Sequence, residues 1–389
     1  MEKKKVLFVI HTLSQGGIQH ALTSVLDAID YEKYNVDLLV LFNKTDIIDK
    51  INPNVHITVC RDPHDYEKEP LSLLYFSLKQ ISKALKLKKS EQHYTSLERD
   101  YVRKKEIDYI VNNYLPKTHY DTAVSYFYGY AAEFVDKYIS ADKKIVFSHA
   151  SIEEFPELHE RIYPHFDMIV TGSPAMAQVI KDAHPSQKQK VSVLKYYIDA
   201  PSVREKARAF VPELPDGRTV ISSCGRLSPE KGYSLAVECA RLLKENGYSF
   251  FWVHAGDGPL RDEIDKKIKE YGLENDFKIL GMLENPFPYV YNSDIFVQPS
   301  LFDGNPLSVE EAHILCVPVV ETATLGGKFL IKDGENGLLS DINAESLYEK
   351  LSRMISDDEL RIKIKKNLES IDRDGERADY ISAVNNMLS

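Results

Sequence analysis

The stretch DIFVQPSLFDGNPLSVEEA, residues 294–312, decides the fold because a strand, a loop and a helix start follow one another in it. The run IFVQ is short and apolar, which is typical of a buried strand. The loop after it carries Asp303 and Gly304. Pro306 fits the first position of a helix with Asn305 as its N-cap. A strand that leads into a helix in this way is the building unit of parallel α/β sheets.

The start of this predicted helix has the chemistry of an anion site. The amides of Leu307 and Ser308 would be unpaired donors, and such a terminus attracts phosphate. Glu311 lies in the second turn, where its carboxylate oxygens suit the vicinal hydroxyls of a ribose. Asp303 could reach a sugar beyond the phosphate. The alternative stays open that Asp303 is a turn residue and Glu311 a solvated helix charge.

The same alternation of strand and helix extends along the whole chain. Strands are predicted at 6–13, 36–42, 121–127, 144–149 and 168–173, and again at 219–225, 249–256, 277–281, 294–300 and 317–322. Continuous apolar strands of this kind indicate parallel sheets covered on both faces. The segment 198–218 has three prolines and no clean periodicity, so we expect a linker there and two doubly wound domains around a deep cleft.

Three further loops follow predicted strands and could hold a diphosphate. In GRLSPEKG, residues 225–232, Arg226 and Lys231 flank a helix predicted from Pro229, which favours an anion. In AGDGPL, Gly256 and Gly258 permit close backbone approach before a helix predicted from Pro259. In SQGG, Gly16 and Gly17 lie between the first strand and its helix. Solvated cations and plain tight turns are the alternatives for each loop taken alone.

Composition excludes several classes of protein. Residues 1–199 hold 26 Lys+Arg and 27 Asp+Glu, a net charge of −1, whereas the remainder holds 23 and 32, a net charge of −9. This acidic half argues against nucleic-acid binding. The four cysteines are widely spaced, which indicates reduced thiols. The N-terminal run VLFVI predicts a strand rather than a signal peptide. No apolar run reaches the length that a membrane span requires. We expect a cytoplasmic protein. Neither GxGxxG nor GxxxxGKS is present.

In combination these motifs resemble the retaining glycosyltransferases of family 4, which have the GT-B fold (glycosyl transferases group 1). The motifs that carry the resemblance occur in one order within 218–345, namely GRLSPEKG, AGDGPL, ILG, DIFVQPSLFDGNPLSVEEA, VPVV and LIKDGENGLL. Residues 1–30 match more weakly and 50–120 hardly at all. The resemblance implies an acceptor-side domain, 1–199, completed by a C-terminal segment, 372–389, and a nucleotide-sugar-binding domain, 200–371.

The resemblance also implies roles for individual residues. Arg226 and Lys231 would bind the donor pyrophosphate, Glu311 the ribose and Asp303 the donor sugar, and His149 would lie near that sugar. A strand-end histidine satisfied by its neighbours is the alternative for His149. The implied catalytic set is Asp303, Glu311, Arg226, Lys231 and His149. The implied donor-binding set is Gly16, Gly17, Gly225, Arg226, Lys231, Gly256, Gly258, Leu283, Gly304, Asn305, Pro306, Leu307, Ser308 and Glu311.

Two residues depart from the family pattern. Asp303 stands where glutamate is usual and is one methylene shorter, which puts in doubt which sugar is held. Cys316 stands where the helix usually ends in glycine, and we expect only a local change of backbone geometry. The resemblance implies retention of configuration by front-face attack, with no metal and no cofactor beyond the nucleotide-sugar donor, for which UDP is favoured.

The acceptor is less well defined by the sequence. Residues 70–105 mix an apolar face with many lysines and arginines, which favours contact with an anionic membrane. A helix packed on its own domain is the alternative. Membrane contact would suit a saccharide or polyprenyl-linked acceptor in capsule or other bacterial surface polysaccharide synthesis at the inner face of the membrane. A protein or small-molecule acceptor, or a non-catalytic sugar-nucleotide-binding protein, remains an alternative.

Overall fold

A computed structural model describes residues 2–14, 16–60, 107–149, 156–373 and 375–389 of the chain. The chain forms two compact units. Unit 1 comprises Met1–Thr171, Ile180–Leu194 and Ile381–Ser389, and unit 2 comprises Gly172–Val179 and Lys195–Tyr380. The predicted membrane-contact segment, 70–105, lies wholly outside the described residues.

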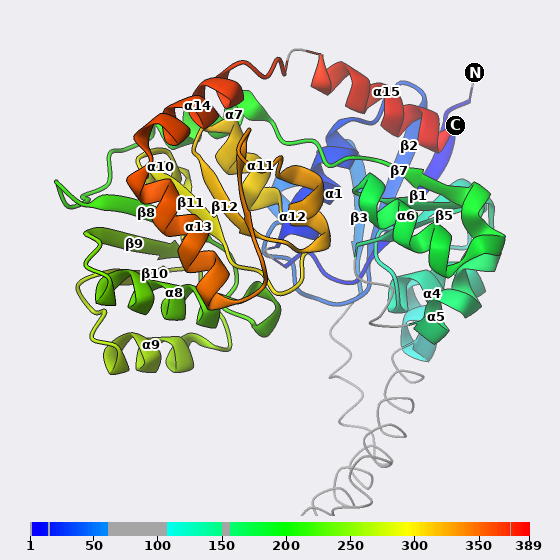
Figure 1. Cartoon of the computed structure of the whole chain (residues 1–389). Helices are drawn as coiled ribbons and strands as arrows, with labels where there is room; N and C mark the ends of the chain where they lie inside the picture. Colours follow the sequence, from blue (N-terminus) through cyan, green and yellow to red (C-terminus); the bar gives the residue numbers. More distant parts are fainter. Residues whose placement is uncertain (1, 15, 61–106, 150–155, 374) are drawn as a thin grey trace, which may run out of the picture. The chain divides into compact units, whose positions relative to one another are not determined.

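Unit 1 contains a seven-stranded parallel sheet with the order β3-β2-β1-β4-β5-β6-β7 (Figure 1). Its strands are β1 (Lys4–Ile10), β2 (Tyr34–Val40), β3 (Val55–Val59), β4 (Tyr120–Ser125), β5 (Ala141–Ser148), β6 (Met168–Thr171) and β7 (Val191–Val193). In β1 the apolar run 6–10 is completely buried, because helices cover both faces of a parallel sheet. The sequence analysis did not predict β3 and β7, which are short and lie at the sheet edges.

The helices of unit 1 follow its strands in the alternating pattern that the sequence predicts. They are α1 (Gly17–Asp27), α4 (Tyr130–Tyr138), α5 (Pro156–Ile162) and α6 (Pro174–Ala183), the last of which is shared with unit 2. The end of α15 (Glu376–Leu388) also packs here. The Asn385 side chain donates to Ala28 O at 2.8 Å and accepts from Asp30 N at 2.9 Å. The chain therefore completes unit 1 with its last residues.

Unit 2 contains a six-stranded parallel sheet with the order β10-β9-β8-β11-β12-β13. Its strands are β8 (Thr219–Cys224), β9 (Phe250–Ala255), β10 (Phe277–Gly281), β11 (Ile295–Gln298), β12 (Val319–Thr322) and β13 (Gly337–Ser340). Five of them lie in predicted segments, and β13 is the strand that was not predicted. Two parallel α/β sheets confirm the predicted fold class for the two units.

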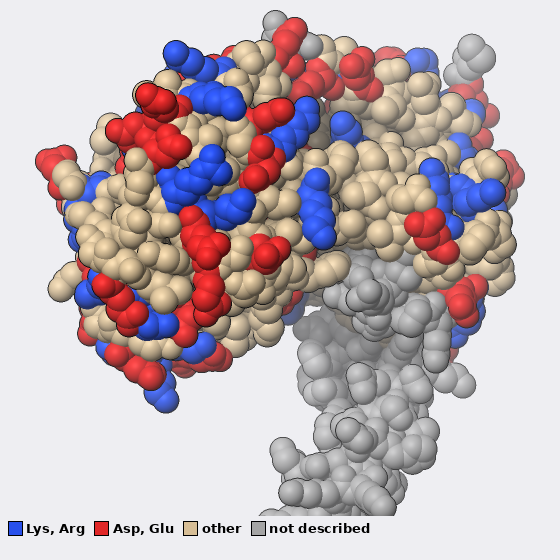
Figure 2. Space-filling view, viewed as in Figure 1, with Lys and Arg blue, Asp and Glu red and all other residues tan. Residues whose placement is uncertain are grey.

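Helices cover both faces of the unit 2 sheet (Figure 1). One apolar core joins the sheet to α8 (Tyr233–Glu245), α9 (Arg261–Glu270), α13 (Ala344–Ser356) and α14 (Asp358–Glu369). A second core joins the other face to α7 (Ala200–Ala207), α10 (Phe287–Tyr291), α11 (Leu307–Ile314) and residues near α12 (Leu325–Leu330). Acidic and basic side chains lie interspersed over the face shown in Figure 2. The negative charge of this half therefore forms no single acidic field on that face.

Candidate functional site

The strand order of unit 2 creates a crevice between two loops. The chain builds the sheet outward from β8 in one direction, through β9 and β10, and from β11 in the other, through β12 and β13. The loops after β8 and β11 therefore diverge at the carboxyl edge of the sheet, and ligands of open α/β sheets bind at such a point. These are the loops in which the sequence analysis predicts the diphosphate and sugar contacts.

Lys231 and Asp303, one from each loop, form an ion pair. Lys231 Nζ lies 2.6 Å from Asp303 Oδ2. The side chain of Asp303 is 9% exposed and that of Lys231 is 29% exposed, so the pair is largely shielded from water. The structure thus brings together the two residues that were predicted to bind the pyrophosphate and the donor sugar.

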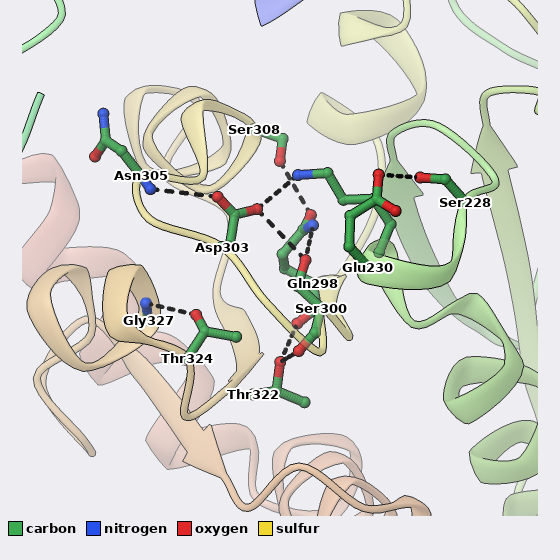
Figure 3. Close-up of polar contacts among 11 residues, drawn as sticks. Ser228, Glu230, Gln298, Ser300, Asp303, Asn305, Ser308, Thr322, Thr324 and Gly327 are labelled. Carbon is green, nitrogen blue, oxygen red and sulfur yellow. Dashed lines mark hydrogen bonds and ion pairs between the residues drawn. The ribbon is translucent and has the colours of Figure 1, made fainter. Parts of the chain in front are cut away.

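A polar floor supports the Asp303 loop (Figure 3). Asn305 N donates to Asp303 Oδ1 at 3.3 Å, and Ser300 Oγ donates to Asp303 Oδ2 at 3.4 Å. Below them, buried Gln298 donates to Ser300 Oγ at 2.8 Å and accepts from Ser308 Oγ at 3.0 Å. Because these contacts fix both carboxylate oxygens and the start of α11, the loop is held from several sides.

The helices after both loops begin later than predicted. Pro229–Lys231 forms a 3₁₀ turn, and α8 starts at Tyr233 after Gly232 in a left-handed conformation. Pro306 has φ −75° and ψ 92°, so it is the N-cap, and α11 starts at Leu307. Asn305 therefore does not cap the helix as predicted. Its backbone N–H instead bonds Asp303, because the extended proline carries the chain away from the helix axis. Similarly, α9 starts at Arg261 rather than Pro259.

Close backbone contacts explain two glycines of these loops. Gly232 has φ 66°, and a Cβ there would lie 2.0 Å from Pro299 O in the loop after β11. A Cβ on Gly256 would lie 1.9 Å from Gly225 O. Residues with side chains would force these loops apart. The glycines therefore bring the loops of β8, β9 and β11 into one small area at the sheet edge.

Arg226 and two backbone amides offer further donors at this edge. The Arg226 side chain is exposed and makes no hydrogen bond or ion pair with the described residues. The N–H groups of Leu307 and Ser308, in the first turn of α11, also have no hydrogen-bond acceptor within the described part of the chain. Unpaired amides at a helix start and an unpaired guanidinium on the loop after the neighbouring strand β8 are both donors that attract an anion.

Glu311 lies in the second turn of α11, as predicted. Burial raises its pKa to about 7, and the negative charge of neighbouring Glu310 adds to this effect. The pKa of Glu310 is also raised to about 7, chiefly by burial. Near neutral pH, Glu311 is therefore present both as a carboxylate, which only accepts hydrogen bonds, and as a carboxylic acid, which can also donate one.

The sequence analysis missed Glu321, which is buried at the end of β12. It is fully shielded from solvent, and neither carboxyl oxygen has a hydrogen-bond partner among the described residues. Burial raises its pKa well above the ordinary value, and the negative charge of Asp303 adds to this effect while Lys231 opposes it. An acidic residue in the otherwise apolar run VPVVET is the signal that could have found it.

The other predicted residues of unit 2 also lie at the carboxyl edge of the sheet. Gly225 follows β8, Gly256 and Gly258 follow β9, and Leu283 follows β10. Gly304, Asn305 and Pro306 lie between Asp303 and α11. Cys316 follows α11 with φ 57°, the left-handed geometry usual for a helix-ending glycine. The structure thus places the predicted donor-binding residues of unit 2 in the loops at one sheet edge and in the first turns of α11.

The predicted residues of unit 1 lie at the carboxyl edge of its own sheet. Gly16 and Gly17 connect β1 to α1, and His149 follows β5. His149 Nε2 lies 3.0 Å from Tyr126 O, and burial lowers the pKa of His149 to about 4. The ring is therefore neutral at physiological pH.

An aromatic cluster surrounds the switch point of unit 1, between β1 and β4. The His11 ring lies 4.7 Å from Phe42, 5.9 Å from Phe127 and 5.6 Å from Tyr130, measured between centroids. All four side chains are partly exposed. The run YFYGY at 126–130 supplies Phe127 and Tyr130 to this cluster. The contribution of His11 and Phe42 was not predicted, because it depends on which strands are neighbours.

The described residues contain neither a metal-binding cluster nor a membrane-spanning helix. No group of three or more His, Cys, Asp or Glu side chains among them could hold a metal ion. None of their helices combines the length and the apolar composition that crossing a bilayer requires.

Comparison with known proteins places these observations in a family. Residues 204–370 match the model of the glycosyl transferases group 1. The chain is 29% identical over 202 residues to a 4-alpha-N-acetylgalactosaminyltransferase of Campylobacter jejuni, with 51% of this chain and 54% of that protein covered. It is 26% identical over 199 residues to the lipopolysaccharide core glycosyltransferase LpsE of Rhizobium meliloti, with 51% and 56% covered. The chain thus spans about half the length of these relatives.

Solved structures share the fold over the whole chain. TarM of S. aureus has a TM-score of 0.72 at 16% identity, with 99% of this chain and 100% of that chain covered. HepE of Anabaena, solved with UDP, has a TM-score of 0.65 at 17% identity, with 99% and 98% covered. At such identities the likeness shows the fold alone. Residues 204–370, the greater part of unit 2, are thus similar in sequence to the glycosyl transferases group 1.

Proposed function

We propose that the protein is a glycosyltransferase that moves a sugar from a nucleoside-diphosphate donor to a hydroxyl of a saccharide or lipid-linked saccharide. The observation that carries this proposal is the Lys231–Asp303 ion pair at the switch point of unit 2. Beside it lie the unpaired guanidinium of Arg226 and the two unpaired amides of α11. These groups match a diphosphate flanked by a ribose and a sugar.

In the proposed donor complex, Lys231 exchanges one anion for another. The diphosphate draws the ammonium away from Asp303, and the Asp303 carboxylate then accepts hydrogen bonds from the donor sugar. Arg226, Lys231 and the amides of α11 stabilise the charge that develops on the departing nucleotide. We propose that these cations take the place of a metal ion at the diphosphate. Glu311 holds the ribose.

The stereochemical course that we propose is retention. The acceptor hydroxyl attacks the anomeric carbon from the face that the nucleotide leaves, and its proton passes to the departing phosphate oxygen. The glycosidic C–O bond to the nucleotide breaks and the C–O bond to the acceptor forms, so that the products are the glycosylated acceptor and the nucleoside diphosphate. The residues named above bind and orient the donor for this step.

UDP is the donor nucleotide that we propose. HepE was solved with UDP and with UDP-glucose, and the TarM complex contains UDP. An E. coli relative, 28% identical over 184 residues, is named as a UDP-Gal-dependent galactosyltransferase that acts on a diphosphoundecaprenol acceptor. The Campylobacter relative is likewise named for a diphospho-undecaprenol acceptor. These names support a lipid-linked acceptor. With such an acceptor we propose a role in bacterial surface polysaccharide or capsule synthesis at the inner face of the membrane.

Release of UDP from a panel of UDP-sugars, with and without undecaprenyl-diphosphate-linked saccharides, tests the proposed function. We expect acceptor-dependent release with one donor, and an Arg226→Ala variant about 10²-fold slower. Arg208→Ala is the matched control, because Arg208 is also exposed and its side chain makes no hydrogen bond or ion pair within the described part of unit 2. UDP binding without turnover on any acceptor would favour a non-catalytic binding protein. Equal rates for both variants would contradict the assignment of Arg226.

A further inference from the structure

The buried carboxyl of Glu321 makes none of the proposed donor contacts, yet it lies in the structure that supports them. Glu321 of β12 is in register with Gln298 of β11, and the strands are parallel. Residues in register on parallel strands point to the same face of the sheet. On that face Gln298 contacts Ser300 and Ser308 beneath the Asp303 loop. Glu321 therefore extends this polar floor by one strand.

The surroundings of the Glu321 carboxyl group leave it neither solvent nor a hydrogen-bond partner among the described residues. The residue is 0% exposed, and a Cβ on Gly327 would lie only 3.0 Å from its carboxyl carbon. Within the described residues, no group bonds either carboxyl oxygen. An ionised carboxylate in such a place carries a large desolvation cost, whereas the neutral acid carries a much smaller one. The geometry therefore favours the protonated form.

Two charged groups act on Glu321 from the elements packed around it. Asp303, from the loop after β11, disfavours a second negative charge, and Lys231, from the turn after β8, favours it. The neighbouring groups from α12 and β13 are neutral. The backbone of Gly327 in α12 approaches the Glu321 side chain. The Ser340 hydroxyl, at the end of β13, donates to the backbone carbonyl oxygen of Glu321 at 3.4 Å. The charge on Glu321 is therefore coupled directly to the ion pair of the donor site.

We propose that Glu321 is a positioning residue of the donor site that acts in its protonated form, leaving Lys231 paired with Asp303 alone and able to exchange that partner for a diphosphate. An ionised Glu321 would add a second carboxylate to the same ammonium in a region shielded from water. The diphosphate would then have to displace two negative charges and would meet stronger repulsion. This inference rests on the proposed function, since it concerns the same donor site.

The inference makes donor binding depend on pH in one direction. Below its raised pKa, Glu321 keeps its proton and Lys231 can bind the diphosphate. As the pH rises toward the raised pKa of Glu321, the carboxylate forms and competes for Lys231. Donor affinity therefore falls with rising pH, and a side chain that cannot ionise at position 321 removes the part of the fall that Glu321 causes.

Titration calorimetry of UDP binding between pH 6.5 and 8.5 tests the inference with the full chain. Glu321→Gln keeps the shape of the neutral acid, and Glu321→Leu is a second uncharged variant in case the first does not fold. Glu359→Gln, an exposed carboxylate on α14, is the matched control. We expect the wild-type protein and the control to bind UDP more weakly at pH 8.5 than at pH 6.5, and both Glu321 variants to lose less affinity over the same range, because only the share of the fall that Glu321 causes is removed.

The possible outcomes separate the inference from the proposed function. If the wild-type protein and Glu321→Gln bind UDP with superimposable pH profiles, the positioning role of Glu321 is wrong, although UDP binding stands. If the wild-type protein does not bind UDP at pH 6.5, the UDP donor of the proposed function fails and the inference fails with it. A purely structural role would change the thermal unfolding of the ligand-free variants and leave the pH dependence of UDP affinity unaltered.

Discussion

At the scale of single residues, Lys231 and Asp303 have a structural role as well as the proposed functional one. Asp303 is 9% exposed, so removal of Lys231 leaves a nearly buried carboxylate without its counter-charge. We expect Lys231→Met to lower the free energy of unfolding by about 3 kcal/mol. The double variant Lys231→Met/Asp303→Asn should recover most of this loss but no activity. Chemical denaturation combined with a UDP-release assay measures both effects, and a double variant as unstable as the single one would argue against a direct pair.

Glu311 gives a stability prediction whose sign follows from its raised pKa. The folded protein holds the proton of Glu311 up to a pKa of about 7, whereas the ordinary value is 4.5. The free energy of unfolding therefore falls as the pH rises from about 4.5 to about 7, by up to roughly 3 kcal/mol. Glu311→Gln removes this pH dependence of the free energy of unfolding. The variant should therefore gain stability relative to the wild type as the pH rises from about 4.5 to about 7. Parallel stability curves for the two proteins would show that Glu311 is not buried as described.

The sequence could predict the residue types of the donor site but not all of their contacts. Arg226, Lys231, Asp303 and Glu311 were found because their motifs are local. The pairing of Lys231 with Asp303 depends on the order of strands β8 and β11, which no local pattern contains. The same holds for Glu321, whose proximity to Asp303 follows from the register of β12 on β11.

At the scale of elements, apolar runs predicted the central strands well because burial on both faces requires continuous apolar sequence. The helix starts were less predictable. Pro229 and Pro306 are both compatible with a first helical position, yet one begins a 3₁₀ turn and the other is an extended N-cap. The contacts between neighbouring loops, rather than local propensity, decide these conformations. The short edge strand β13 was missed for lack of a long apolar run.

Gly232 provides a prediction about how the two site loops meet. Gly232 and Gly247 both have positive φ, but a Cβ on Gly247 would meet nothing within 4 Å. Alanine at either position therefore costs about 1–2 kcal/mol of left-handed strain. Only Gly232→Ala also collides with Pro299 O, so we expect a clearly larger loss of stability and loss of UDP binding. Thermal unfolding and calorimetry of the two variants test this, and equal effects would contradict the packing of the loops.

At the scale of the whole molecule, the two sheets and the order of their strands reproduce the predicted pair of doubly wound domains. The end of the chain belongs to unit 1, where Val384 and Leu388 are buried. Asn385→Ala removes both bonds to the segment after α1, and we expect unit 1 to lose about 1–3 kcal/mol of stability. Asn386→Ala, on the exposed side of α15, is the matched control. Hydrogen exchange of β1 and β2 measures the effect, and unchanged protection in Asn385→Ala would show that α15 does not stabilise this sheet.

The crystal structure of the protein with bound UDP would test the central claim most directly. The account predicts the diphosphate at the switch point of unit 2, within hydrogen-bonding distance of Lys231 Nζ and of the amides of Leu307 and Ser308, with Lys231 parted from Asp303. A diphosphate bound elsewhere, or bound there while Lys231 still pairs with Asp303, would contradict it.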